Sequence, residues 1–332
     1  MPDFLTRLET FLSSRTQAGP VERLTQDAST REYFRIMWRK GTAIACVYPE
    51  PFNAAEQSYI DVTNLFEKAG LPVPCIFDFD ENLGVIVQED LGDRILRDEL
   101  VKADAETRES LTLKAVAMIP RIQAATQKAF DLNSIASRLS FDTEKLMWEF
   151  EFFKTHYFTT YKAETLPIDE DAALAAEFLE LARELETKAC VLCHRDFHAA
   201  NLMLDQNNQL RIIDHQDARL GSTAYDLVSF LLDRVTEPQS TEWLAEKRSF
   251  FLRERKSLGL AEIDEAAFAE EFRLQTIQRC LKAIGTFSFQ SVNRGKTYFV
   301  PFIEPMFQIV LRALENLDRF PAMQKMVTRE LA

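Results

Sequence analysis

The pattern of hydrophobic and polar positions divides the chain into a strand-rich first part and a helix-rich remainder. Residues 4–12 place Phe and Leu at helical spacing, which predicts an amphipathic N-terminal helix. Short stretches rich in β-branched and aromatic residues follow it and predict strands, with one helix expected over residues 54–69. The predicted strands cover residues 21–24, 32–39, 42–48, 75–79 and 84–89.

Beyond residue 92 the pattern changes to long amphipathic helices. Apolar residues recur there at intervals of three and four, which is the spacing of one helix face. Two short apolar runs, residues 190–193 and 210–213, predict strands that each end at a cluster of His and Asp side chains. The predicted helices cover residues 104–128, 142–161 and 169–187, and further helices run from residue 224 to the C-terminus.

The order of these elements predicts an α+β fold with two lobes. A small mixed sheet forms the first lobe, residues 1–91, and a larger, mainly helical lobe follows, residues 92–332. We expect a ligand cleft between the lobes, because binding sites occur preferentially where two packed units meet. The polar clusters at the strand ends are therefore the first candidates for chemistry.

Composition narrows the classes of partner. The chain has 332 residues and a formal net charge of −13, which disfavours binding to nucleic acid or to an anionic membrane surface. Its N-terminus lacks the basic start and apolar run of a signal peptide. Five scattered Cys residues do not form a disulfide framework. Together these features predict a cytoplasmic protein, and they indicate no oligomeric state.

The densest group of chemically active side chains lies in CHRDFHAANLML and LRIIDHQDARLG, residues 193–204 and 210–221. Asn201 follows Asp196 by five positions, and Asp214 follows Asn201 by thirteen. Phosphoryl transfer needs a carboxylate that orients the acceptor hydroxyl and oxygen ligands that hold Mg²⁺ against the nucleotide phosphates. We therefore assign Asp196 as the catalytic base and Asn201 and Asp214 as the Mg²⁺ ligands.

Several motifs resemble those of known small-molecule kinases. HRDFHAAN is similar to the HxDxxxxN catalytic loop of aminoglycoside and choline kinases, and IDHQDA resembles their IDxxD metal motif. The resemblance spans residues 25–315 and is greatest to the bacterial N-acetylmuramate/N-acetylglucosamine anomeric kinases. It implies a protein-kinase-like fold, use of ATP and Mg²⁺, and a small-molecule hydroxyl acceptor. The other similar stretches are DASTREYFR (27–35), QEDLGDR (88–94), AYDLVSFLLD (224–233) and IQRCLKAIGTF (277–287).

The resemblance also implies where the nucleotide binds. A phosphate-covering turn is expected at residues 27–31, with Ser29 and Arg31 as its contacts. This turn contains no Gly, and the strand at 42–48 lacks the Lys that protein kinases place there. We predict that Arg31 supplies the missing charge, with Arg35 or Lys40 as weaker candidates. The hinge whose backbone meets adenine would be formed by Gln88, Glu89, Asp90 and Leu91.

Further residues are assigned supporting or acceptor-side roles. Asp226 heads a helix and, by resemblance, braces the backbone of the catalytic loop. His194, Arg195 and Asp217 belong to the two motifs and are expected to support them. Candidates for contact with the acceptor are His198, Gln278, Arg279 and Lys282.

Alternatives to this interpretation remain. Asp and Asn favour turns, so Asp196, Asn201 and Asp214 could be turn formers alone. A second hypothesis is a two-metal hydrolase site, because H-x-D-x-H and D-H-x-D are plausible ligand spacings; it would use His198, His215, Asp196, Asp214 and Asp217. A third is a pseudokinase that binds nucleotide without turnover.

The acceptor is also open. The stretch from Asp214 to Tyr225 is too short for the peptide-docking segment of a protein kinase, so we expect a small molecule. An amino sugar phosphorylated at its anomeric hydroxyl is the first choice. An aminoglycoside or another amino alcohol is the alternative, and acidic residues around the acceptor would favour it.

Overall fold

The computed structural model describes residues 3–24 and 30–332. The chain divides into two compact units, and it passes between them more than once. The predicted division at residue 91 stays a prediction. The first unit comprises Met1–Thr107, Lys128–Ile135 and Ala199–Asp217, and the second comprises Arg108–Gln127, Ala136–His198 and Ala218–Ala332.

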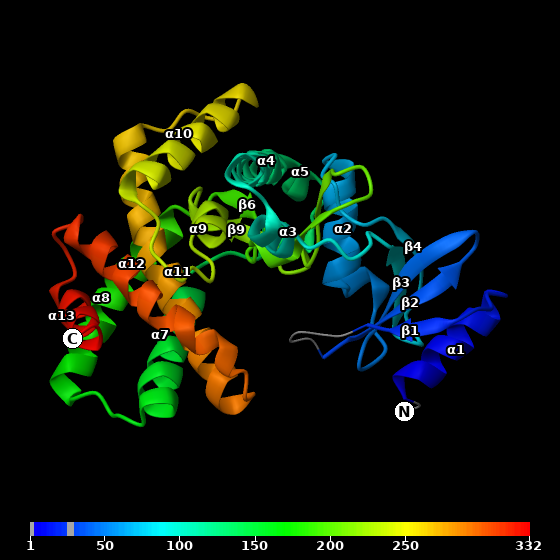
Figure 1. The fold of residues 1–332 in the computed structure, drawn as a ribbon, viewed down its shortest axis with the longest axis horizontal. Helices are drawn as coiled ribbons and strands as arrows, with labels where there is room; N and C mark the ends of the chain where they lie inside the picture. Colours follow the sequence, from blue (N-terminus) through cyan, green and yellow to red (C-terminus); the bar gives the residue numbers. More distant parts are fainter. Residues whose placement is uncertain (1–2, 25–29) are drawn as a thin grey trace. The chain divides into compact units, whose positions relative to one another are not determined.

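A five-stranded antiparallel sheet with strand order β1-β2-β3-β5-β4 forms the centre of the first unit (Figure 1). Phe34 of β2 lies opposite Ala45 of β3, which in turn lies opposite Val87 of β5. This register brings every second residue of the three central strands to the same face. The strands are β1 (Val21–Arg23), β2 (Glu32–Trp38), β3 (Gly41–Val47), β4 (Ile76–Asp80) and β5 (Val85–Glu89).

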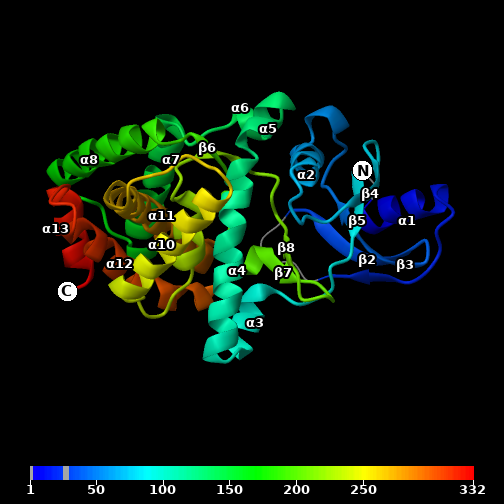
Figure 2. The same cartoon turned by 90° about the horizontal axis from the view of Figure 1, so that it is seen from above.

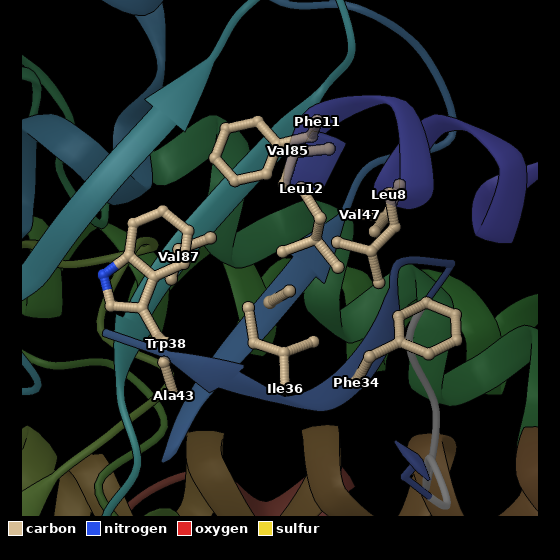
Figure 3. Close-up of a cluster of buried hydrophobic side chains, with 11 residues drawn as sticks. Leu8, Phe11, Leu12, Phe34, Ile36, Trp38, Ala43, Val47, Val85 and Val87 are labelled. Atoms are coloured by element: carbon tan, nitrogen blue, oxygen red, sulfur yellow. The ribbon is translucent and has the colours of Figure 1, made fainter. Parts of the chain in front are cut away.

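Helix α1 (Phe4–Ser14) covers one face of this sheet (Figure 3). Its N-terminus is capped by Asp3, whose Oδ1 accepts a hydrogen bond of 2.8 Å from the backbone N–H of Thr6. Phe11 stacks on Trp38 with ring centroids 5.9 Å apart. Full burial of each such side chain contributes about 1.5–3 kcal/mol. The core consists of Leu8, Phe11, Leu12, Phe34, Ile36, Trp38, Ala43, Ala45, Val47, Val85 and Val87.

The alternate residues of these strands point to the other face. Because Ala43, Ala45 and Val47 pack under α1, Ile44 and Cys46 must face the opposite side. That second face forms the wall of the cavity described below. The alternating residues of β3 thus form a core face and a cavity face.

Some of the remaining elements of the first unit also line this cavity, through Tyr59, Asn201 and Met203. A short hairpin of β7 and β8 pairs Leu202 with Ile212, and the backbone N–H of Ile212 donates to the carbonyl of Pro72 at 2.8 Å. These elements are η1 (Ala54–Glu56), α2 (Ser58–Lys68), α3 (Leu96–Lys102), α5 (Thr126–Asp131), η3 (Ala199–Asn201), β7 (Leu202–Leu204) and β8 (Leu210–Ile212).

The second unit is mainly helical and packs around α11 (Glu265–Asn293), which contacts α7, η2, α9 and α12 (Figure 2). Gly285 allows α11 to approach α7 closely, because a Cβ there would lie 2.7 Å from the Cα of Phe153. The other elements are α4 (Ala105–Ala124), α6 (Ile135–Arg138), α7 (Thr143–Lys154), the π-helix η2 (Thr155–Lys162), α8 (Ile168–Thr187), β6 (Val191–Cys193), β9 (Arg219–Gly221), α9 (Tyr225–Leu231), α10 (Thr241–Ser257), η4 (Thr297–Phe302), α12 (Ile303–Glu315) and α13 (Pro321–Glu330).

The predicted α+β class is confirmed, and the differences are local. The helix expected over 104–128 ends at Ala124, and a separate helix begins at Thr126. The helix expected over 142–161 changes to a π-helix at Thr155. Strands β7 and β9, each three residues long, were not predicted.

Across the described residues, none of the helices combines the length and the apolar character that crossing a bilayer requires.

Candidate active site

In the second unit, a buried carboxylate holds the backbone of residues 194–196, the HRD segment. Asp226, in the first turn of α9, accepts hydrogen bonds from the backbone N–H groups of His194 at 2.7 Å and Arg195 at 3.0 Å. Arg195 has a φ of 84°, a conformation that non-Gly residues rarely adopt. Burial raises the pKa of Asp226 to about 6, and the nearby His194 opposes that rise. Asp226 therefore stabilises an unusual backbone turn immediately before Asp196.

Asp196 lies among cations of the same unit. Its Oδ1 is 3.6 Å from Nζ of Lys282 and 3.7 Å from a guanidinium nitrogen of Arg279. Its Oδ2 is 3.8 Å from Nε of Arg195. Burial alone would raise the pKa of Asp196, but these three charges outweigh it and hold the pKa well below its usual range. Asp196 is thus ionised and suited to accept a hydrogen bond from an acceptor hydroxyl.

The candidates for the acceptor side differ in their surroundings. Arg279 and Lys282 reach Asp196, and Arg279 also donates to Oγ of Ser229 at 3.2 Å. Gln278 instead donates to Oε2 of Glu149 at 2.7 Å and is fully buried. The backbone N–H of His198 donates to the carbonyl of Asp196 at 3.0 Å, and burial lowers the pKa of the imidazole.

In the first unit, the hairpin of β7 and β8 brings Asn201 and Asp214 together. The side-chain nitrogen of Asn201 lies 3.4 Å from Oδ2 of Asp214, and Gln216 donates to Oδ1 at 2.9 Å. The backbone N–H of Ile213 donates to the carbonyl of Asn201 at 3.0 Å, which aligns the two segments. Asp214 has a φ of 60°, and such strained positions concentrate at functional sites. Asp217 is not among the described residues that line the adjoining cavity.

These two side chains lie at the edge of a cavity of about 480 Å³ within the first unit. Its volume is within the usual range of small-molecule sites. Apolar and aromatic side chains form most of its wall, which suits a flat base such as adenine. The lining residues are Leu24, Arg31, Tyr33, Arg35, Ile44, Cys46, Tyr48, Tyr59, Pro74, Gln88, Glu89, Asp90, Leu91, Gly92, Asp93, Ile95, Asn201, Met203, Ile213, Asp214 and Gln216.

The hinge candidates line this cavity, and their side chains have protein partners. Gln88 accepts a hydrogen bond from the hydroxyl of Tyr59. Glu89 accepts one of 2.9 Å from Arg211, whose charge lowers the pKa of Glu89 against the opposing effect of burial. Leu91 is buried. Hinge side chains that are tied to the protein leave recognition of a base to the backbone.

Arg31 is the cavity cation that lies beside the candidate metal ligands. Its guanidinium is 3.6 Å from Oδ1 of Asp214 and lies over the rings of Tyr33 and Tyr48, at 5.7 Å from each centroid. Arg35 also lines the cavity but pairs with Asp90 at 2.8 Å.

The other two candidates for phosphate contact are Lys40 and Ser29. Lys40 is exposed and is not one of the described lining residues. Ser29 lies outside the described residues, as do residues 27 and 28 of the expected phosphate-covering turn.

The metallohydrolase alternative receives no support from geometry. The imidazole of His215 lies 2.7 Å from Oγ1 of Thr63 and packs against the rings of Tyr59 and Phe66. Among residues 3–24 and 30–332, no three His, Cys, Asp or Glu side chains are arranged to hold a metal ion together. Of the two cysteines in the run 190–193, Cys193 is buried in β6, whereas Cys190 precedes the strand and is exposed.

Sequence reasoning missed several residues of the two sites. Tyr48, Cys46 and Tyr33 line the cavity, and the alternation along β2 and β3 was a usable signal for them. Tyr59 and Met203 carry no such signal. Glu149 in the second unit is a carboxylate on the buried face of α7, and an acid at an apolar position of the helical pattern could have indicated it.

Comparison with known proteins identifies the family of the chain. A family model described as "Phosphotransferase enzyme family" matches residues 20–261. The chain is 27% identical over 293 residues to the N-acetylmuramate/N-acetylglucosamine kinase of Neisseria meningitidis serogroup B. This match covers 87% of this chain and 84% of that relative.

Solved structures of kinases share the fold. The choline kinase LicA from Streptococcus pneumoniae matches with a TM-score of 0.59 and 15% identity, over 94% of this chain and 98% of that one. The ADP-bound aminoglycoside phosphotransferase APH(2'')-Ib matches with a TM-score of 0.57 and 14% identity, over 92% and 97% of the two chains.

The protein is a small-molecule kinase with a protein-kinase-like fold. The family model covers well over half of its residues, so the chain belongs to the phosphotransferase enzyme family. The expected family and enzyme class are thereby confirmed, and the expected use of ATP follows from that class.

Proposed function

We propose that this kinase transfers the γ-phosphoryl group of ATP to the anomeric hydroxyl of an amino sugar, N-acetylmuramate or N-acetylglucosamine. One observation carries the proposal: the carboxylate of Asp196 lies within 4 Å of three cations, which keep it ionised. The name of the 27% identical relative supports the same acceptor. Asp196 would accept a hydrogen bond from the sugar hydroxyl and orient it for attack.

The nucleotide would bind in the cavity of the first unit. Apolar side chains such as Ile44 and Met203 would contact the base, and the backbone of residues 88–91 would pair with it. Arg31 would neutralise phosphate oxygens, because guanidinium groups pair well with phosphate. This assignment rests on its position beside Asp214 at the end of the cavity.

Asn201 and Asp214 would hold Mg²⁺. The residues fit this role, since a carboxamide and a carboxylate lie side by side and hard oxygen donors are the ligands that Mg²⁺ prefers. Bound Mg²⁺ supplies neutralisation of phosphate charge. The strained backbone at Asp214 directs the carboxylate toward the cavity wall that contains Arg31.

The low basicity of Asp196 is compatible with catalysis of phosphoryl transfer. The transition state is loose, with little bond formation to the nucleophile, so the acceptor proton can leave late. Asp196 therefore acts mainly by positioning. Asp226 would keep the preceding backbone in place, with His194 and Arg195 as the anchored residues.

The surroundings of Asp196 favour a sugar over an aminoglycoside. Aminoglycosides and amino alcohols are cationic, and a site that binds them needs surplus carboxylates. Asp196 instead has Lys282, Arg279 and Arg195 within 4 Å. An aminoglycoside or amino-alcohol kinase remains the alternative that the test below includes, together with a nucleotide-binding pseudokinase.

The test is an ATP-consumption screen with wild type and Asp196→Asn. The acceptors are N-acetylmuramate, N-acetylglucosamine, an aminoglycoside and choline. The methyl glycoside of N-acetylglucosamine provides a matched control, because its anomeric oxygen is blocked. We expect turnover with the free sugars only. Turnover with the methyl glycoside would refute the anomeric assignment, and turnover with the cationic compounds alone would refute the sugar assignment.

A further inference from the structure

Helix α7 contains a buried carboxylate that no motif indicated. Glu149 has an exposed fraction of 0%, and its Oε2 accepts a hydrogen bond of 2.7 Å from Gln278. Its Oε1 lies 3.7 Å from Nζ of Lys145, one turn earlier on the same helix. A buried charge is retained only when other charges or hydrogen bonds compensate it. Glu149 therefore links Lys145 of α7 to Gln278 of α11. The charged side chains around these two helices form one cluster.

Among the residue pairs that the structure describes here, cations outnumber carboxylates. Four cations, Lys145, Arg195, Arg279 and Lys282, interact with the two carboxylates Asp196 and Glu149. Asp233 is a further carboxylate whose charge acts on Arg279. Asp233 itself lies 3.5 Å from Arg234, so this pair adds no net charge.

Lys145 is a partly buried member of this cluster that pairs with Glu149. Burial lowers the pKa of its ammonium group, and the charges of Arg195 and Arg219 lower it further against the opposing effect of Glu149. Partly desolvated cations of this kind favour the approach of an anion. The surplus positive charge thus indicates an acidic group on the bound acceptor.

An exposed aromatic surface adjoins Lys145. Nζ of Lys145 lies 3.9 Å from the ring centroid of Trp148, whose exposed fraction is 56%. Trp148 contacts Phe152 at 5.4 Å between centroids, and Phe152 contacts Phe289 of α11 at 5.9 Å. Phe152 and Phe289 are partly buried, so Trp148 is the exposed end of this row of rings. Their flat faces suit the apolar face of a sugar ring.

We propose that Lys145 and Trp148 form a specificity-determining part of the acceptor site, in which Lys145 binds a carboxylate of the amino sugar and Trp148 packs on the sugar. This inference rests on the proposed function and selects acid-bearing amino sugars as the preferred substrate class. It assigns roles to two α7 residues that lie outside every kinase motif of the chain.

The test compares an acid-bearing and a neutral acceptor. Lys145→Gln removes the charge and keeps a polar side chain. We expect it to reduce kcat/KM for N-acetylmuramate at least about 10-fold, since a charged hydrogen bond contributes about 1.5–3 kcal/mol. Values for N-acetylglucosamine should stay within about 2-fold, because that sugar has no carboxylate. The control is Lys256→Gln, which removes an exposed charge on α10.

Trp148 supplies a second readout that does not depend on turnover. Addition of N-acetylmuramate should change the tryptophan fluorescence of the wild type, and Trp148→Ala should abolish that change. Trp148→Phe should retain part of the affinity for N-acetylmuramate. The chain has only two other Trp residues, so the signal is simple to assign. Thermal unfolding of each variant shows whether it is folded.

Four outcomes decide the proposal. Equal losses with both sugars, or an effect of Lys145→Gln on the KM for ATP alone, would overturn it, because the surplus charge would then serve the structure or the transferred phosphate. A selective loss with N-acetylmuramate supports it. If the wild type phosphorylates neither sugar, the proposed function fails, and this inference fails with it.

Discussion

Nζ of Lys282 lies 3.6 Å from Oδ1 of Asp196, so an ammonium group from α11 pairs with the carboxylate that we assign to the acceptor hydroxyl. The pairing keeps Asp196 ionised and limits its orientation. It also links the HRD segment to a helix whose position depends on close packing against α7. Predictions follow for both the chemistry and the packing.

Asp196→Asn tests the catalytic assignment. The amide keeps the shape of the side chain but accepts the hydroxyl proton poorly. We expect kcat to fall by about 10²- to 10⁴-fold, the usual contribution of a positioned proton acceptor. The dissociation constant of ATP, measured by calorimetry, should stay within about 2-fold because Asp196 acts on the acceptor. An unchanged kcat would remove Asp196 from the mechanism.

Arg31→Ala tests the replacement of the missing strand lysine. We expect the KM for ATP to rise about 10- to 100-fold, since a lost charge-assisted hydrogen bond costs about 1.5–3 kcal/mol. Lys40→Ala is the control, because Lys40 is exposed and lies outside the described cavity lining. Steady-state kinetics at varied ATP would settle the matter, and equal KM values for the two variants would show that Arg31 does not contact the phosphates.

Asp226 should make stability depend on pH. Burial raises its pKa to about 6, compared with about 3.9 in an unfolded chain. The folded state therefore binds this proton more tightly, and the resulting stabilisation is complete below about pH 4 and lost as the pH rises through about 6. A shift of about two units corresponds to roughly 3 kcal/mol.

The measurement for this residue is urea unfolding of wild type and Asp226→Asn at about pH 4 and about pH 7.5. The amide does not titrate, so it serves as the reference. We expect the free energy of unfolding of the wild type, relative to the variant, to decrease by up to about 3 kcal/mol between the two pH values. A difference independent of pH would mean that Asp226 titrates normally.

Gly285→Ala tests the approach of α11 to α7. The added Cβ would lie 2.7 Å from the Cα of Phe153, and backbone atoms cannot move aside without shifting a helix. We expect a loss of about 1–3 kcal/mol in the free energy of unfolding, the usual effect of overpacking. Gly41→Ala is the control, since its Cβ would meet nothing within 4 Å. Similar stabilities of both variants would contradict the packing argument.

The sequence indicated much of the fold because the first unit follows simple alternation. Along β3, Ala43 and Ala45 enter the core while Ile44 and Cys46 face the cavity, and period two predicts both sets. The same pattern does not reveal which face carries a ligand. That choice depends on α1, whose packing on one face is a tertiary contact.

The chemical residues were predictable for a different reason. Asp196, Asn201 and Asp214 lie within a short stretch of sequence in a recognisable order. Glu149 and Trp148 come from a helix distant in sequence, and their relation to Asp196 arises only when α7 and α11 pack together. Local motifs could not indicate that relation.

The most direct test of the central claim is identification of the product. Phosphorus NMR of a mixture of wild type, MgATP and N-acetylmuramate should show ADP and a new sugar phosphate signal that couples to the anomeric proton. Asp196→Asn should give neither within the same time. ADP without a sugar phosphate, or a phosphate on another hydroxyl, would contradict the account.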